Sequence, residues 1–359
     1  MKITKASLAL TAALALSLTA CAANEGTKTT ASTGGLSGTL AGKGSSAMSA
    51  AQKQWITDFQ TKNTGVTVNY SPDGSGAGRD GFTSGAVAFG ASDRPFNDSE
   101  MGVGKFAKCA ADSNALNLPV YISPIAVVFN VTGVDKLNLD AATTAGIFSG
   151  AIKTWNDPKI VALNPGVTLP AANITAVHRS DDSGTTDNFT DWLNANAATV
   201  WTNAHSGTWP AAYAGEAAKG TAGVVDTVTK GQNTIGYVDD SAAAKLGKAS
   251  IKVGDAFVQP TAEGAAKMVD ASAQVAGRAA NDLAFKLSRT TAGTYPLALV
   301  SYALVCQQYK AASDATLVKA YIGYIASADG QASAAKSALA APLSSALQAK
   351  VKTAVDSIK

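Results

Sequence analysis

Histidine and charged residues are scarce in this chain. Only two histidines, His178 and His205, occur among the 359 residues, and 15% of the residues are Asp, Glu, Lys or Arg. A hydroxyl nucleophile needs a base within hydrogen-bond reach, and neither histidine is placed to serve as one. No HExxH motif and no Asp/His cluster offers metal ligands, so we expect no metal and no cofactor. The lack of a suitable base argues against a serine hydrolase, and the lack of metal-ligand motifs argues against a metallophosphatase.

The chain also lacks an excess of charge of either sign. It has 29 Lys and Arg residues against 26 Asp and Glu residues, and two of the basic ones, Lys2 and Lys5, lie in the leader described below. A balanced charge gives no general attraction for nucleic acid or for an anionic surface. Nucleic acid is therefore not expected as a partner, and any anion must be bound locally.

The apolar run at the start of the chain is short. It covers residues 6–20 and cannot span a bilayer as a helix. Basic residues followed by such a run have the layout of a secretory signal, so we predict a signal peptide over residues 1–20. Cys21 directly follows a small residue and resembles a lipobox cysteine, which becomes the N-terminus and takes a lipid on its thiol. Cleavage of an ordinary signal peptide nearby is the alternative.

Residues 21–36 are mostly small and polar and show no apolar period. Such a segment cannot bury enough surface to order itself, so we predict a flexible tether behind the lipidated cysteine. The expected location is the extracytoplasmic face of the cell membrane, with the lipid at Cys21 as the only membrane contact.

Cysteine is the rarest residue after histidine, with three copies. Cys109 and Cys306 remain once Cys21 is assigned to the lipid. An oxidising compartment allows two distant thiols to persist as a disulfide, and we predict that these two pair. Two buried free thiols are the alternative.

The remaining chain alternates between helix and strand patterns. Apolar residues at helical spacing predict helices, and alternating or short apolar runs predict strands. Helices are expected over residues 47–62, 79–84, 141–148 after an Asp140 cap, 189–197, a segment capped by Asp240, 317–325, 328–346 and 347–358. Strands are expected over residues 66–70, 87–92, 118–131, 173–179, 234–239 and 296–306. The segment 328–346 is expected to be solvated.

This alternation indicates an α/β fold with mostly parallel strands. The length is enough for two ordinary domains, and the two long strands look like a two-strand hinge between them. We predict one lobe from residues 37–127 plus 297–359 and a second lobe from residues 128–296, each a mixed, mostly parallel sheet flanked by helices.

Three Gly/Ser/Thr-rich stretches lie where a strand or loop hands over to a helix: Gly44-Ser45-Ser46, Gly74-Ser75-Gly76 and Ser183-Gly184-Thr185. The first turn of a helix has unpaired N–H donors and a positive partial charge, and small residues let an oxyanion approach it. Three such starts from distant parts of the chain predict one enclosed anion. Taken singly, each stretch could equally be a turn.

Six motifs in order resemble the phosphate-binding receptors of high-affinity phosphate ABC transporters, the PstS-type family. They are Gly42-Lys43-Gly44-Ser45-Ser46, Gly74-Ser75-Gly76-Ala77-Gly78, Phe89-Gly90-Ala91-Ser92-Asp93, Trp155-Asn156-Asp157 with Leu163-Asn164-Pro165-Gly166, Arg179-Ser180-Asp181-Asp182-Ser183-Gly184-Thr185, and Ile235-Gly236-Tyr237-Val238. The resemblance covers roughly residues 36–359. It implies a two-lobed periplasmic-binding-protein-like fold of class II and a monomeric receptor that is not an enzyme.

The same resemblance implies a phosphate site. Its residues would be Ser46, Ala47, Ser75, Asp93, Arg179, Ser183, Gly184 and Thr185, with Asp181 holding the Arg179 guanidinium. The chain departs from many relatives at Ala47, where a bulkier residue is common, but that contact is made by the main chain. Asp93 would accept the proton that phosphate carries and sulfate lacks. A helix cap at Asp93 and a surface ion pair at Arg179 are the alternatives.

The predicted function is capture of inorganic phosphate and its delivery to the permease subunits of an ABC transporter. A receptor for another tetrahedral oxyanion, sulfate or molybdate, is the nearer alternative. A serine hydrolase or phosphatase-like enzyme built on Ser183 and Asp93 is another, and a structural lipoprotein of the cell wall is a third.

Overall fold

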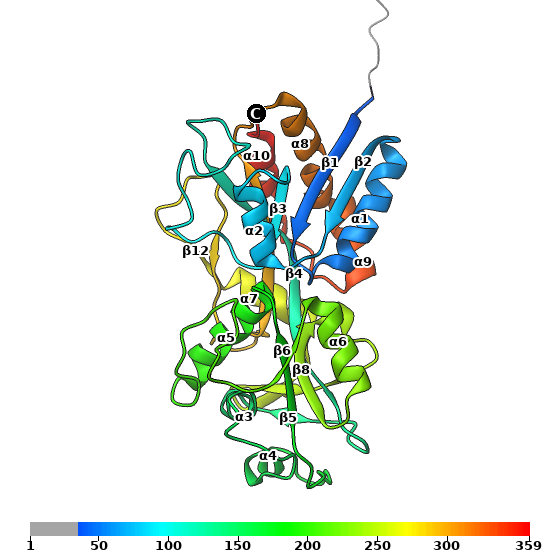
Figure 1. Cartoon of the computed structure of the whole chain (residues 1–359), viewed down its shortest axis with the longest axis vertical. Helices are drawn as coiled ribbons and strands as arrows, with labels where there is room; N and C mark the ends of the chain where they lie inside the picture. Colours follow the sequence, from blue (N-terminus) through cyan, green and yellow to red (C-terminus); the bar gives the residue numbers. More distant parts are fainter. Residues whose placement is uncertain (1–34) are drawn as a thin grey trace, which may run out of the picture. The chain divides into compact units, whose positions relative to one another are not determined.

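Two long strands, β4 (Ala115–Asn130) and β14 (Ala298–Cys306), run antiparallel through the centre of the fold. Nearly all of their residues are buried because elements cover both faces of the sheet, which explains why both read as continuous apolar runs. The computed structural model in Figure 1 describes residues 35–359. The predicted signal peptide, the lipid site at Cys21 and most of the predicted tether lie outside the described residues.

The strands on either side of this pair form parallel ladders. β1 (Ser37–Gly44) pairs in parallel with β2 (Gly65–Ser71) and with β3 (Phe89–Ser92), and β3 pairs antiparallel with β14. Beyond β4, β8 (Thr234–Asp239) pairs antiparallel with β4 and in parallel with β6 (Thr175–Arg179). β7 (Glu216–Ala218) then closes the order β2-β1-β3-β14-β4-β8-β6-β7. The expected mixed α/β sheet is confirmed, and its antiparallel pairs involve the two central strands.

Helices cover both parts of the sheet (Figure 1). Those around β1–β3, which we call the first group together with these strands, are α1 (Ser49–Lys62), α2 (Ser75–Thr83), α8 (Ala312–Ala326), α9 (Ala328–Ala338) and α10 (Ser345–Asp356). Those around β6–β8, the second group, are α3 (Ala141–Phe148), α4 (Pro158–Leu163), α5 (Gly184–Ala197) and α6 (Gly220–Lys230). α7 (Ala262–Asp270) packs on β4 and β14. The lobe boundaries at 127/128 and 296/297 stay a prediction.

Short strands complete the structure of residues 35–359. They are β5 (Asn138–Leu139), β9 (Gly247–Lys248), β10 (Ser250–Val253), β11 (Ala256–Val258), β12 (Ala273–Gln274) and β13 (Phe285–Lys286). Within this part of the chain, no helix combines the length and the apolar character needed to cross a bilayer.

Local sequence signals explain most element boundaries. The Asp140 carboxylate accepts a hydrogen bond from Thr143 N and caps α3, as predicted.

Aromatic side chains pack in the core. Tyr121 of β4 and Trp55 of α1 pack edge to face, with ring centroids 6.3 Å apart. Four of the tryptophans, Trp55, Trp192, Trp201 and Trp209, are buried.

Three expectations about helices were wrong in detail. α2 begins at Ser75 instead of near residue 79, because its glycines pack tightly against β1 and β3. The helix expected directly after Asp240 is not an α-helix. A single 3-10 turn covers Asp240–Ala242, and it is Asp239 that caps it. The segment 328–346 is not one solvated helix: α9 ends at Ala338, α10 begins only at Ser345, and Gln331 and Ala334 are buried in α9, which packs on α1.

Cys109 and Cys306 form a disulfide, as predicted from the expected compartment. It ties the long connection between β3 and β4 to the end of β14, across 197 positions of sequence. Because such a crosslink restricts the unfolded chain, it stabilises the native state.

The Asp239 carboxylate is fully buried at the end of β8, beside β4. The Tyr121 hydroxyl donates to its Oδ1 at 3.1 Å, and Ser241 N donates to the same oxygen at 3.0 Å. Burial raises the pKa of Asp239 from 3.8 to about 7, although hydrogen bonds from Ser241 and Ser123 oppose the rise. The native state therefore keeps a proton here that the unfolded chain releases.

Replacing both bridged cysteines, Cys109→Ala with Cys306→Ala, should lower the free energy of unfolding by about 2–5 kcal/mol. Urea denaturation of the oxidised protein and of the double variant measures this difference. The double variant under reducing conditions is the control. An unfolding free energy unchanged by the double substitution would show that the crosslink does not stabilise the fold.

Asp239→Asn should change how stability depends on pH. In the wild-type protein, Asp239 contributes a loss of stability as the pH rises from about 4 to about 7, because the folded state still holds a proton that the unfolded chain has released. The variant carries no such proton. Its stability relative to wild type should rise by roughly 1–3 kcal/mol between pH 5 and pH 8 in urea denaturation. A difference that is the same at both pH values contradicts the assignment.

Candidate functional site

The three predicted helix starts meet at one place in the structure. Ser75 begins α2, Gly184 begins α5, and the turn after β1 leads into α1. A Cβ atom added at Gly184 would lie 2.6 Å from Ser75 Oγ and 2.5 Å from the Cβ of Asp93. Only glycine allows α5 to approach α2 and the end of β3 this closely. The backbone donors of distant segments are thereby brought together.

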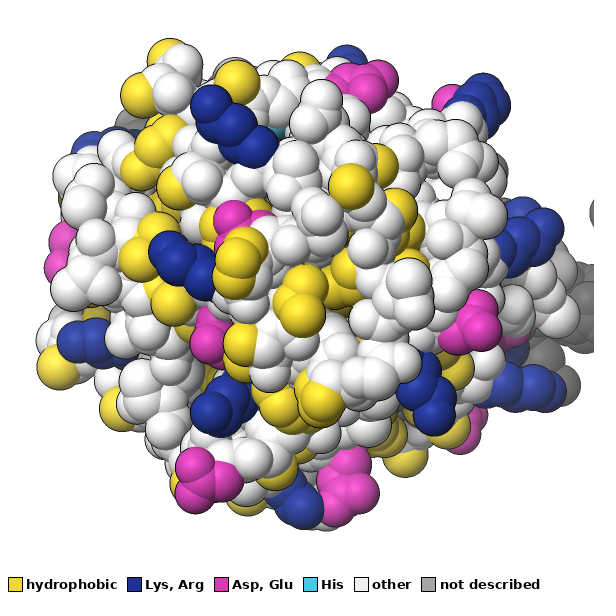
Figure 2. Space-filling view, turned by 90° about the horizontal axis from the view of Figure 1, so that it is seen from below, with side chains coloured by type: hydrophobic (Ala, Val, Ile, Leu, Met, Phe, Trp, Pro, Cys, Tyr) yellow, Lys and Arg dark blue, Asp and Glu magenta, His cyan; other side chains and the backbone are white. Residues whose placement is uncertain are grey.

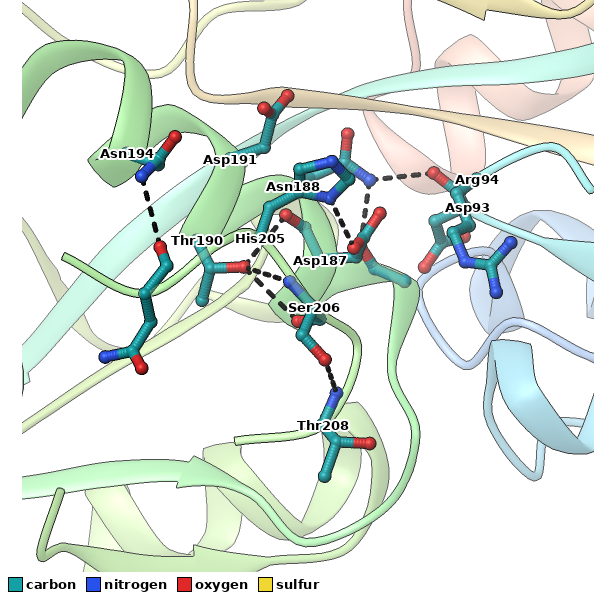
Figure 3. Close-up of polar contacts among 12 residues, drawn as sticks. Asp93, Arg94, Asp187, Asn188, Thr190, Asp191, Asn194, His205, Ser206 and Thr208 are labelled. Carbon is teal, nitrogen blue, oxygen red and sulfur yellow. Dashed lines mark hydrogen bonds and ion pairs between the residues drawn. The ribbon is translucent and has the colours of Figure 1, made fainter. Parts of the chain in front are cut away.

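Asp93 is the carboxylate at this meeting point. It follows β3 directly and is 2% exposed. Ser301 Oγ of β14 donates to its Oδ1 at 2.7 Å, and Thr185 Oγ1 of α5 donates to its Oδ2 at 3.3 Å. Asn188 Nδ2 donates to the backbone oxygen of Asp93 at 2.7 Å, as Figure 3 shows. The residue therefore joins the first group, the second group and a central strand.

The charge state of Asp93 is set by competing effects. Burial raises the pKa of its carboxyl group above the usual value. Hydrogen bonds from Ser45, Ser301 and Thr185, together with the positive charge of Arg179, oppose this rise. A carboxylate that is surrounded by hydroxyl donors and a nearby cation can remain ionised at lower cost than an isolated buried one.

Arg179 ends β6 and is 3% exposed. Its Nε donates to Asp181 Oδ1 at 2.8 Å, and its Nη2 donates to Asp181 Oδ2. Burial alone would raise the pKa of Asp181, but the bonds and charge of Arg179 outweigh it and hold that pKa below its usual value. Asp181 thus fixes one side of the guanidinium and leaves the N–H groups of Nη1 for another acceptor. The expected Arg179–Asp181 pair is present, and it is buried rather than on the surface.

Ser75 and Ser183 each use part of their hydrogen-bonding capacity within the protein. The hydroxyl oxygen of Ser75 accepts from Asp93 N at 3.1 Å. The hydroxyl oxygen of Ser183 caps α5 by accepting from Thr186 N at 3.2 Å, and Ser183 N donates to Gly207 O. Both hydroxyl protons remain available, because a hydroxyl oxygen that accepts a hydrogen bond can still donate one.

Ser46 and Ala47 lie in the turn after β1, and both are buried. Ala47 N donates to Ser45 Oγ at 3.2 Å. Ser46 Oγ accepts from Thr221 N at 3.1 Å and shares a further hydrogen bond with Thr221 Oγ1 at 3.1 Å. Thr221 is at the start of α6, so this turn of the first group contacts a helix start of the second group.

All eight residues predicted to contact an anion are buried and belong to this one assembly of helix starts. Sequence reasoning missed Ser301, Thr221 and Asn188, which bond to the predicted residues, and it named Ser45 only as part of the first stretch. Ser301 carries a weak signal, since it is a lone hydroxyl residue within the apolar run 296–306. Thr221 follows Gly220 just as Thr185 follows Gly184, and this repeated Gly-Thr pair at a helix start could have pointed to it.

The two histidines lie apart from the Asp93 and Arg179 side chains. The His178 ring stacks on Trp209 with centroids 4.7 Å apart, and its Nδ1 lies 2.9 Å from the backbone oxygen of Arg179. His205 Nδ1 bonds Asp187 Oδ1 at 2.9 Å, as seen in Figure 3. Hydrogen bonding to Asp187 raises the pKa of His205.

Chemically, the site combines hydroxyl and N–H donors, one guanidinium and one carboxylate acceptor. Donors and a cation bind an oxyanion, and the carboxylate favours one that carries a proton. On the face seen in Figure 2, basic, acidic and apolar side chains are interspersed, and the basic ones do not gather into a patch.

Comparison with known proteins gives the family. A model of the PBP superfamily domain matches residues 29–329. The phosphate-binding protein PstS 2 of Mycobacterium tuberculosis is 35% identical over 98% of this chain and 98% of its own length. The chain belongs to the PstS-type phosphate-binding protein family. The phosphate-binding protein PstS 3 of Mycobacterium leprae is 38% identical to this PstS-type chain over 79% of it and 78% of the relative.

Solved structures agree on the fold. A high-affinity periplasmic phosphate-binding protein, PfluDING, solved with phosphate bound, is 23% identical and has a TM-score of 0.68, covering 88% of this chain and 93% of that one. The phosphate-binding protein of Stenotrophomonas maltophilia is 18% identical with a TM-score of 0.68, covering 88% and 94%. The predicted family and fold class are confirmed.

Proposed function

We propose that this PstS-type chain is an extracytoplasmic receptor that binds inorganic phosphate and delivers it to an ABC permease. The observation that carries the proposal is the buried carboxylate of Asp93 placed among helix starts and beside Arg179. The names of the curated relatives and the phosphate bound in a structural neighbour support the same ligand.

Each residue has a role in this proposal. Arg179, oriented by Asp181, offers the N–H groups of Nη1 to a phosphate oxygen. Ser46 and Ser75 donate from their hydroxyls, and Ala47 contributes through its backbone. At the start of α5, Ser183, Gly184 and Thr185 supply donors that the helix leaves unpaired.

Asp93 provides the selectivity. Phosphate near neutral pH carries a proton, which an ionised Asp93 accepts. Sulfate has no proton to give and would face the carboxylate with like charge in a desolvated site, at a cost of several kcal/mol. The alternative ligands, sulfate and molybdate, fit this acceptor poorly. We propose that the chain binds phosphate and catalyses no reaction, because the site offers hydrogen-bond donors and an acceptor to the ligand but no base beside Ser183.

Binding would close two lobes, residues 37–127 with 297–359 and residues 128–296, about the two central strands. Each lobe supplies part of the donor set, so closure completes the site and excludes water. We further propose that the mature chain starts at Cys21, carries a lipid there and acts as a monomer tethered to the outer face of the membrane by residues 21–36.

Calorimetric titration tests the proposal directly. The wild-type protein should bind phosphate with measurable heat and a stoichiometry of one, arsenate should compete because it is also a protonated tetrahedral anion, and equimolar sulfate should give no competing signal. Incubation with aryl phosphates and esters is the control for enzyme activity. Absence of phosphate binding, or turnover that Ser183→Ala abolishes, refutes the proposal.

Asp93→Asn should weaken phosphate binding about 10- to 100-fold, because it removes a charge-assisted hydrogen bond. Sulfate binding should stay the same or improve, since the repelling charge is gone. The ratio of the two dissociation constants, measured by calorimetry at pH 7, reports the effect. Ser301→Ala is a milder comparison that keeps the carboxylate and removes one of its donors. A ratio unchanged by Asp93→Asn would mean that selectivity arises elsewhere.

A further inference from the structure

Asp182 of the second group bonds to α2 of the first group, immediately beside the site. Asp182 Oδ2 accepts from Arg79 Nη2 at 2.7 Å, and the backbone oxygen of Asp182 accepts from Gly76 N at 3.0 Å. Asp182 lies in the loop between β6 and α5, between Asp181 and Ser183. A side-chain ion pair and a backbone hydrogen bond thus join the two groups at one residue.

The contact is also tightly packed. A Cβ atom added at Gly76 would lie 2.5 Å from Asp182 Cβ, and one added at Gly207 would lie 2.1 Å from Asp182 Oδ1. Asp182 therefore fits between α2 on one side and the segment at Gly207 on the other. A side chain at Gly76 would push the loop, and with it Ser183, away from α2, and a side chain at Gly207 would collide with the Asp182 carboxylate.

Arg79 is held firmly by its own group. Its side chain is 5% exposed, its Nη1 donates to Ser92 Oγ at 3.0 Å, and its Nε lies 3.5 Å from Glu100 Oε1. Glu100 is in turn bound by Arg94 at 2.7 and 2.8 Å. The buried Arg79 guanidinium is thus fixed by Ser92 and Glu100. Asp182 can form an ion pair with it only when the two groups lie close together.

We propose that the Asp182–Arg79 pair is a latch that sets how long the closed receptor keeps its ligand. This inference rests on the proposed function, since the ligand is the phosphate of that proposal. Neither side chain donates to the ligand in the proposed site, so the latch acts on release and leaves the choice between phosphate and sulfate to Asp93. Asp182 is a positioning residue, because it holds the loop that follows Arg179 and carries Asp181 and Ser183.

The expected size of the effect follows from exposure. Arg79 is buried but the Asp182 side chain is 44% exposed, so solvent screens part of the attraction. A charge-assisted hydrogen bond with one buried partner still favours the closed state enough to slow opening about tenfold. Because the pair forms only on closure, its loss should appear in the dissociation rate.

The experiment compares Asp182→Asn with wild type in a chase of bound radiolabelled phosphate by excess unlabelled phosphate. Asparagine keeps the shape and the backbone bond to Gly76 but loses the charge. The phosphate dissociation rate should rise about tenfold, while the association rate and the phosphate-to-sulfate ratio stay within about twofold of wild type.

Asp73→Asn is the matched control. Asp73 is also 44% exposed and pairs with Lys43 at 3.2 Å, but both residues belong to the first group, and Asp73 directly precedes Gly74. Asp73→Asn also removes one negative charge near the site, but it breaks no contact between the groups. The phosphate dissociation rate of this variant should therefore match that of wild type. An unchanged rate in Asp182→Asn, or an equal increase in both variants, overturns the latch. A wild-type protein that retains no phosphate overturns the proposed function instead, which calorimetry on the same sample establishes separately.

Discussion

The structure around the site depends on hydrogen bonds that hold one buried residue, Asp93, to a central strand, to α2 and to α5. Asp93 receives hydrogen bonds from Ser301 of a central strand and Thr185 of α5, and its own backbone is bonded to Ser75 and Asn188. An ionised group without these partners would be too costly to bury. The same bonds draw α2, α5 and β14 to one point, so satisfying the charge and assembling the site are one physical requirement.

The sheet makes this meeting possible. β3 ends at Ser92, directly before Asp93, and β6 ends at Arg179, and each is followed by a loop whose polar residues contact the other group. The central strands β4 and β14 pair with each other and run between the groups. Gly184, which faces Ser75 and Asp93, and Gly76, which faces Asp182, let the two groups come close together. Backbone approach at glycine, rather than long side chains, therefore brings the donors within reach of a small anion.

Much of the local structure could be predicted from sequence. The strand over residues 234–239, the helix after Asp140 and the long apolar strands follow from period and caps, which are local properties. The errors arose where tertiary packing overrides such signals. α2 starts early because its glycines lie against β1 and β3, and α9 ends early because Ala340 and Ala341 are drawn into the core beside β4.

The sequence by itself determined the family, the mixed α/β class and the residue types that an anion site needs, and it predicted a Cys109–Cys306 disulfide that the structure confirmed. The order of the motifs and the residue types at the helix starts are properties of short stretches of chain, so they can be recognised without coordinates. Only the tertiary structure decided that Ser301 bonds Asp93, that Thr221 bonds Ser46 and that Asp182 reaches Arg79. These contacts join residues more than 100 positions apart, and no local pattern encodes which distant partner a buried polar group will find.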